Sequence, residues 1–106
     1  MTQPARFTAR AQREFLEALR QVEHASAAER LRRSVEDMAR WLGQHPLMGR
    51  LEPTLADARY RFCSIPGFPY LLVYRPGTSP PSIVRFVHTA RDLPALLVRL
   101  RGPEPH

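Results

Sequence analysis

The chain has 106 residues and a formal net charge of +6, and 43% of its residues are hydrophobic. This length suits one folded domain, and the hydrophobic fraction argues against an intrinsically disordered chain. No apolar run approaches the roughly 20 residues that cross a bilayer, and residues 1–13 carry arginines instead of a hydrophobic signal region. We therefore expect a cytoplasmic protein with no membrane partner, a single domain over 1–101 and a tail over 102–106.

All sixteen basic residues are arginine, because the sequence contains no lysine. Catalysis by lysine is thereby excluded, whereas arginine offers a rigid fork of donors that suits phosphates and carboxylates. A basic domain attracts anionic partners such as nucleic acids, acidic protein surfaces or membranes. The net charge alone does not choose among these three classes.

The first half of the chain has the periodicity of two helices. Residues 5–8 suit a short strand, and Thr8 suits the N-cap of a helix over 9–24. A second helix is expected to begin at a capping box formed by Ser26 and Glu29, and to run to about residue 42. Gly43 then suits a C-cap, and the short connection predicts an antiparallel helix hairpin.

From residue 59 the period changes to two, which is typical of strands. Strands are expected over 59–65, 70–75 and 82–89, and the short turns between them predict an antiparallel meander. Asp92 suits the N-cap of a final helix, whose apolar stripe comprises Leu93, Leu96, Leu97 and Leu100.

These elements define an α+β domain in which helices cover one face of a small antiparallel sheet. Its order is an N-terminal strand, an antiparallel helix hairpin, a three-stranded antiparallel meander and a C-terminal helix. The first strand joins an edge that the sequence does not determine. The apolar positions place Phe15, Leu19, Val35, Met38, Val84 and Phe86 in the core.

Few residues suit cofactor or metal chemistry. The four histidines are scattered and the single cysteine, Cys63, allows no intramolecular disulfide, so we expect no metal site and no cofactor. A lone cysteine is either a nucleophile or, more commonly, a small buried apolar residue, and we expect the buried role.

The polar residues of interest lie on the meander. The period of two allows Arg59, Arg61 and Arg85 to form one basic face, with His88 and Arg91 near a strand end. Each arginine is either a target contact or a solvated charge that protects the sheet from aggregation. Since Val84 and Phe86 share the face of His88, this histidine is either a core-edge residue or an acid–base group.

Three stretches together resemble the ParE branch of the RelE/ParE toxins. They are residues 61–75, with the Gly-Phe-Pro-Tyr turn at 67–70, the ending His88-Thr89-Ala90-Arg91-Asp92, and the loop Pro46-Leu47-Met48-Gly49-Arg50. The resemblance implies the fold described above and a toxin of a type II toxin–antitoxin pair. A cognate antitoxin is then the implied partner, in a toxin–antitoxin hetero-oligomer. Because the small sheet cannot cover every amphipathic helix, we also expect exposed apolar surface.

Within this family, the resemblance implies two alternative activities. ParE members poison DNA gyrase, whereas RelE members cut messenger RNA on the ribosome, and the shared fold does not decide between them. Ribonuclease members often carry an arginine where this chain has Leu71, and some carry a tyrosine where it has Thr89. The gyrase activity is therefore expected, with no catalytic residue and with Arg59, Arg61, Arg85, His88 and Arg91 facing the target. In the ribonuclease alternative, His88 and Arg61 are the catalytic candidates.

Overall fold

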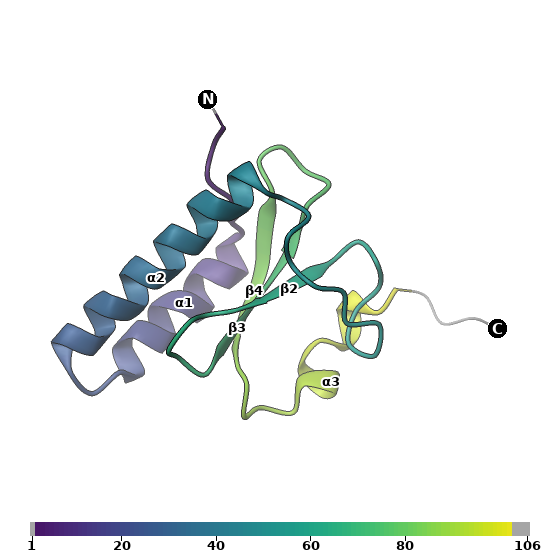
Figure 1. Ribbon diagram of the computed structural model, residues 1–106. Helices are drawn as coiled ribbons and strands as arrows, with labels where there is room; N and C mark the ends of the chain where they lie inside the picture. Colours follow the sequence, from purple (N-terminus) through teal and green to yellow (C-terminus); the bar gives the residue numbers. More distant parts are fainter. Residues whose placement is uncertain (1, 103–106) are drawn as a thin grey trace.

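The computed structural model describes residues 2–102, so the end of the predicted tail, 103–106, lies outside the described residues. A four-stranded sheet has the order β1-β4-β3-β2 (Figure 1). Its strands are β1 (Arg6–Phe7), β2 (Arg61–Ser64), β3 (Tyr70–Arg75) and β4 (Ser82–His88). The predicted antiparallel meander of β2, β3 and β4 is confirmed. β1 pairs with β4 in parallel, so the sheet is mixed and the prediction of an antiparallel sheet is wrong for this edge.

The predicted helix hairpin consists of α1 (Ala9–Gln21) and α2 (Ala25–Gln44). Thr8 caps α1 as expected, since its Oγ1 accepts a hydrogen bond of 3.2 Å from the backbone N–H of Ala11. The predicted capping box is wrong, because α2 begins at Ala25 with His24 as its N-cap and no side-chain cap. The first helical hydrogen bond then runs from the Ala28 N–H to the His24 carbonyl, at 3.0 Å.

Gly43 lies inside α2 and is not the predicted C-cap, because the helix continues to Gln44. A Cβ atom at this position would lie 2.0 Å from the carbonyl oxygen of Gln3. Two residues further on, the Ala5 N–H donates a 2.8 Å hydrogen bond to the Ala39 carbonyl. The glycine therefore allows the N-terminal segment to cross α2 at close range and enter β1.

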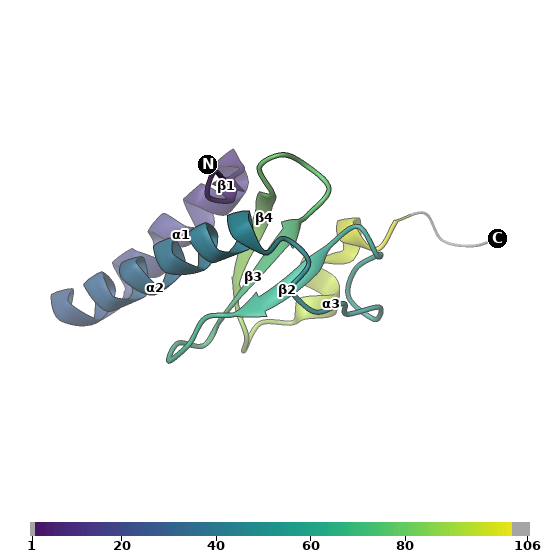
Figure 2. The same cartoon turned by 45° about the horizontal axis from the view of Figure 1, so that its top comes forward.

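Two apolar cores lie on opposite faces of the sheet. The first lies between the sheet and the helix hairpin, and its members include Phe15, Leu19, Val35, Leu72 and Phe86. The second lies under α3 (Leu93–Leu96) and η1 (Val98–Leu100), and its members include Phe62, Leu71, Val73, Val87 and Leu97. In Figures 1 and 2, α3 lies on the side of the sheet away from the hairpin.

The expectation that the helices cover one face is therefore wrong, because β3 carries apolar side chains on both faces. The C-terminal helix is confirmed in short form, and the side chain of its N-cap, Asp92, accepts from the Ala95 N–H at 3.4 Å.

A bulge in β4 changes which of its side chains share a face. Arg85 lies opposite Val73 and Ile83 lies opposite Tyr74, which leaves Val84 as an extra residue. Val84 therefore packs against the second core while Phe86 lies in the first, so the expectation that they share a face is wrong. Among the other predicted core residues, Met38 is half-buried and the rest are buried.

Candidate functional site

The loop over residues 46–49 is held to the sheet by the side chain of Tyr74. The Tyr74 hydroxyl donates to the Pro46 carbonyl at 2.6 Å and accepts from the Gly49 N–H at 2.8 Å. The ring is fully buried, and this burial raises the pKa of Tyr74 above its ordinary value. The Pro-x-x-Gly-Arg motif seen in the sequence therefore has a structural role in fixing this loop.

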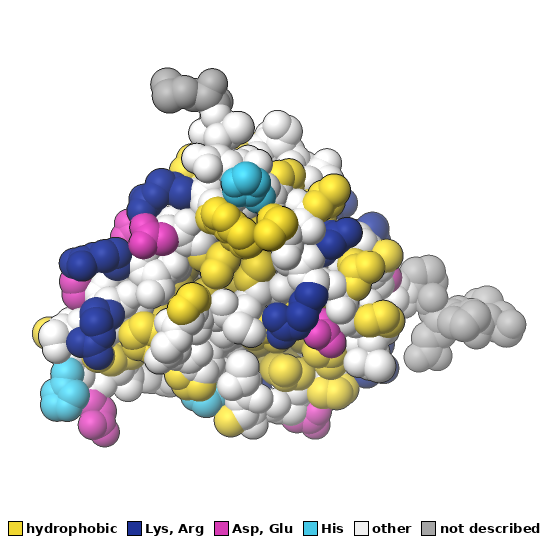
Figure 3. Space-filling model, in the orientation of Figure 1, with side chains coloured by type: hydrophobic (Ala, Val, Ile, Leu, Met, Phe, Trp, Pro, Cys, Tyr) yellow, Lys and Arg dark blue, Asp and Glu magenta, His cyan; other side chains and the backbone are white. Residues whose placement is uncertain are grey.

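Arg61 contacts the same loop. Its guanidinium donates to the carbonyls of Leu47 and Gly49, at 3.1 and 2.9 Å. At the tip of this loop, Leu47 and Met48 are 65% and 60% exposed. Figure 3 shows hydrophobic side chains gathered over the end of α2 and the segment that follows it. The expected exposed apolar surface is therefore present, and Arg61 helps to display it.

Arg85 is buried, with 5% of its surface exposed, so the expected exposed basic face with Arg59 and Arg61 is wrong. Its guanidinium donates to both carboxylate oxygens of Glu14, at 2.8 to 3.2 Å, and to the Leu96 carbonyl at 2.8 Å. Glu14 also accepts from the Phe86 N–H at 3.0 Å, on the edge of β4 that β1 leaves free. Arg85 therefore joins α1 to α3 and is enclosed by them.

Arg59 is exposed and lies before β2, because this strand begins at Arg61 and not at residue 59 as predicted. Its side chain binds the Asp57 carboxylate, with a shortest distance of 2.7 Å, and its backbone N–H donates to the same group at 2.8 Å. These hydrogen bonds lower the pKa of the Asp57 carboxyl below its usual value. Arg59 thus stabilises the turn into β2, and its role as a target contact stays a prediction.

His88 and Arg91 lie together at the end of the sheet opposite to Arg61. His88 pairs with Tyr70, whereas Arg61 pairs with Tyr74 at the other end of β3. Four residues along a strand are about 13 Å, and the Arg61 guanidinium is held by the loop. The structure therefore does not bring together the two catalytic candidates of the ribonuclease alternative. The Nδ1 atom of His88 accepts from the Ala90 N–H at 3.0 Å.

His88 and Arg91 line an open groove between α1 and the end of β4, with a volume of about 530 Å³. The opposite wall is formed by polar side chains of α1, namely Arg10, Arg13, Glu17, Arg20 and Gln21. The sequence reading did not place these arginines in the site. A signal was present, since residues 10, 13, 17 and 20 recur at spacings of three and four along one helix face.

The surroundings of the single cysteine, Cys63, do not suit a nucleophile. Cys63 is 7% exposed in the first core, and burial raises the pKa of its thiol to about 11. Compared with the ordinary value of 9.0, this shift lowers the thiolate fraction at pH 8 about 100-fold. We expect iodoacetamide at pH 8 to alkylate the native protein at least about 100 times more slowly than the urea-unfolded protein. Equal rates, measured by mass spectrometry, would show that this thiol is accessible.

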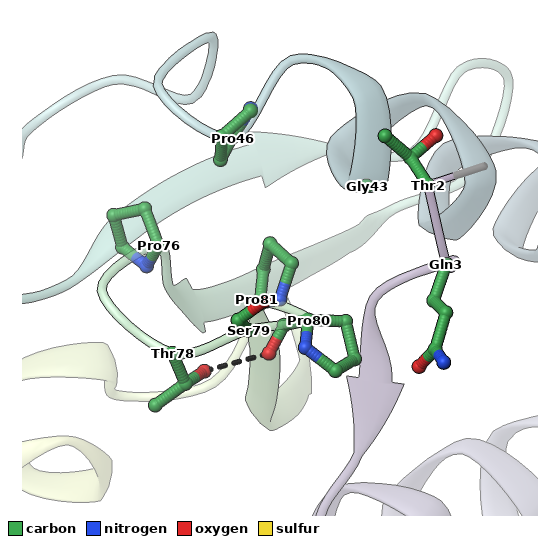
Figure 4. A pocket seen from close by; sticks show the side chains of 9 residues that line it. All are labelled: Thr2, Gln3, Gly43, Pro46, Pro76, Thr78, Ser79, Pro80 and Pro81. Atoms are coloured by element: carbon green, nitrogen blue, oxygen red, sulfur yellow. Dashed lines mark hydrogen bonds between the residues drawn. The ribbon is translucent and has the colours of Figure 1, made fainter.

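A second pocket, of about 380 Å³, lies between the N-terminal segment, the end of α2 and the β3–β4 turn (Figure 4). Its described lining consists of neutral residues, mostly proline, glycine, serine and threonine, and offers no acid–base group. Within residues 2–102, no three histidine, cysteine, aspartate or glutamate side chains are grouped as a metal site. Over the same residues, no helix has the length and apolarity to cross a bilayer.

Residues 5–93 match the family described as the ParE toxin of type II toxin–antitoxin systems, parDE. Since the match covers most of the chain and the α+β fold agrees, the chain belongs to this family. It is therefore the toxin component of a type II pair, and its family implies a cognate antitoxin as partner. No curated protein matches the sequence.

Proposed function

We propose that this toxin poisons DNA gyrase and thereby blocks replication, instead of cutting messenger RNA on the ribosome. The observation that carries the proposal is the separation of His88 from Arg61, at opposite ends of β3. A ribonuclease needs groups that converge on one phosphodiester, and general acid–base assistance contributes about 10²- to 10⁴-fold to such a reaction. Because His88 and Arg61 are held apart, they do not supply this acid–base assistance to one phosphodiester.

The environment of Leu71 and Thr89 also supports gyrase as the target. Leu71 is 3% exposed in the second core, so no polar catalytic group stands at this position. Thr89 is exposed, and its hydroxyl donates to the Pro69 carbonyl at 3.3 Å. The groove that contains His88 and Arg91 thus offers charge and shape, and within residues 2–102 the Nδ1 atom of His88 is bound by the Ala90 N–H and not by a carboxylate.

A gyrase poison needs a surface that binds one state of the enzyme more tightly than the others, because differential affinity shifts a conformational equilibrium. Arg91, His88 and the arginines of α1 form such a surface on this chain. Arg85 is excluded from the target contacts, since its guanidinium is enclosed between Glu14 and α3. The side chain of Arg59 binds Asp57 in the turn before β2, and that of Arg61 binds the carbonyls of the loop over 46–49.

The test has two arms that use the same purified chain. In the first, the toxin is added to gyrase and supercoiled DNA, and we expect covalent gyrase–DNA cleavage complexes to accumulate. In the second, it is added to translating ribosomes with a defined message, and we expect the message to remain intact. The Arg85→Ala variant, which we expect to be destabilised, is the negative control in both arms.

One result would overturn the proposal. Codon-specific cleavage of the message that disappears in His88→Ala, without cleavage complexes in the gyrase arm, identifies the chain as a ribosome-dependent endoribonuclease.

A further inference from the structure

The groove between α1 and the end of β4 carries a large share of the molecule's net charge. Five arginines and two glutamates line it, a net charge of +3, compared with +6 for the whole chain. The groove is open to solvent and is not an enclosed cavity. It therefore suits an extended anionic ligand.

The two glutamates leave three of the five groove arginines without an ion pair among the described residues. Glu14 is engaged by Arg85, and Glu17 accepts hydrogen bonds from Arg20 and Gln21. The side chains of Arg10, Arg13 and Arg91 are exposed, and within residues 2–102 the structure gives them no ion-pair partner. Three guanidinium groups are thus free to bind phosphate on both walls of the groove.

The side chains in the groove favour a double helix over a single strand. Its tyrosine and phenylalanine rings, Tyr70 and Phe86, are only 8% and 2% exposed, which leaves the half-buried imidazole of His88 as the one ring of the groove lining for stacking on unpaired bases. The α1 arginines extend from residue 10 to residue 20, about 15 Å along the helix axis. Over that length one strand of B-DNA carries about four phosphates.

We propose that this groove binds the sugar–phosphate backbone of duplex DNA. Its role in the cell rests on the proposed function, because the duplex would be the DNA segment that gyrase holds. Arg10 and Arg13 contact phosphates from one wall and Arg91 from the other, while the buried Glu14–Arg85 pair keeps α1 beside β4. Binding of this kind depends steeply on salt and weakly on sequence.

The experiment measures fluorescence anisotropy of a labelled 24-base-pair duplex with the full-length chain, at salt concentrations from 50 to 200 mM. The test variant is Arg10→Glu with Arg13→Glu, and the matched control is Arg30→Glu with Arg33→Glu. Both pairs are exposed, three residues apart on a helix and equal in charge change, but Arg30 and Arg33 lie on α2 outside the groove. Circular dichroism spectra of both variants are compared with the wild type to check that each variant is folded.

We expect the groove variant to bind at least about 10 times more weakly at 100 mM salt, with a slope of log K against log salt reduced by about 2. The control variant is expected to stay within about 3-fold of the wild type. Equal weakening in both variants would overturn the inference, because only net charge would then matter. Tighter binding of single-stranded RNA of equal length than of the duplex would overturn it as well.

The gyrase arm separates this inference from the proposed function. If the duplex binds the wild type but not the groove variant, and no gyrase–DNA cleavage complexes accumulate, the result supports DNA binding in the groove and contradicts gyrase as the target. If cleavage complexes accumulate but the groove variant binds the duplex as tightly as the wild type, the result contradicts DNA binding in the groove and leaves gyrase as the target.

Discussion

Replacing Arg85 by alanine is expected to lower the free energy of unfolding by about 2–4 kcal/mol, because it removes the buried member of an ion pair and leaves a half-buried carboxylate without its partner. The Arg85 side chain is 6% exposed and the Glu14 side chain 24% exposed, at a distance of 2.8 Å. The Leu96 carbonyl also loses its donor. This loss is large for a single substitution in a domain of this size.

Urea unfolding of the Arg85→Ala chain measures the effect directly. The control is Arg91→Ala, an exposed arginine three residues beyond the end of the same strand, for which we expect a change within about 0.5 kcal/mol. A double-mutant cycle with Glu14→Ala isolates the energy of the pair. If Arg85→Ala unfolds at the wild-type urea concentration, the pair is not structural and Arg85 returns to the candidates for target contact.

Replacing Gly49 by alanine is expected to cost about 1–3 kcal/mol, because the added methyl group overpacks a buried site. Its Cβ atom would lie 2.6 Å from both the Cε1 and Oη atoms of Tyr74, whose ring is fully buried. The ring cannot move away without weakening the hydrogen bonds that hold Pro46 and Gly49. We therefore expect the loop to detach from the sheet.

Gly77→Ala is the matched control for this change, because a Cβ atom there has no heavy atom within 4 Å. Its stability should remain within about 0.5 kcal/mol of the wild type. Combining Gly49→Ala with Tyr74→Phe should cost less than the sum of the two single changes, since both disturb the same hydroxyl contact. Additive costs would show that the two residues act independently.

The elements that the sequence predicted well are those with strong local signals. Phe15 and Leu19 belong to the apolar stripe of α1 and Val35 to that of α2, and each is buried. The strand over 70–75 is flanked by proline and glycine turns, and its boundaries agree with β3. Thr8 and Asp92 cap helices as expected, because a cap depends on residues only three positions away.

Features that depend on distant residues were not predicted. The two residues of β1 contain no information about which edge they join, and the bulge at Val84 reverses an alternation that looks regular. Arg85 looks like an exposed strand residue because its partner, Glu14, lies 71 positions earlier. The α1 arginines were recognisable as one polar stripe, but their place opposite His88 depends on how α1 packs against β4.

The pairing of distant segments affects when a growing chain becomes active. Glu14 and Arg85 are 71 residues apart in the sequence, and β1 pairs with β4, the last strand to be synthesised. At translation rates of 5–20 residues per second, about 4 to 14 s pass between the synthesis of these two residues. During that time α1 has neither its ion-pair partner nor the strand that forms the other wall of the groove. A ribosome that stalls within the meander therefore carries a chain without the groove. Each newly made toxin gives its antitoxin an interval of seconds before the groove that we propose to bind DNA exists.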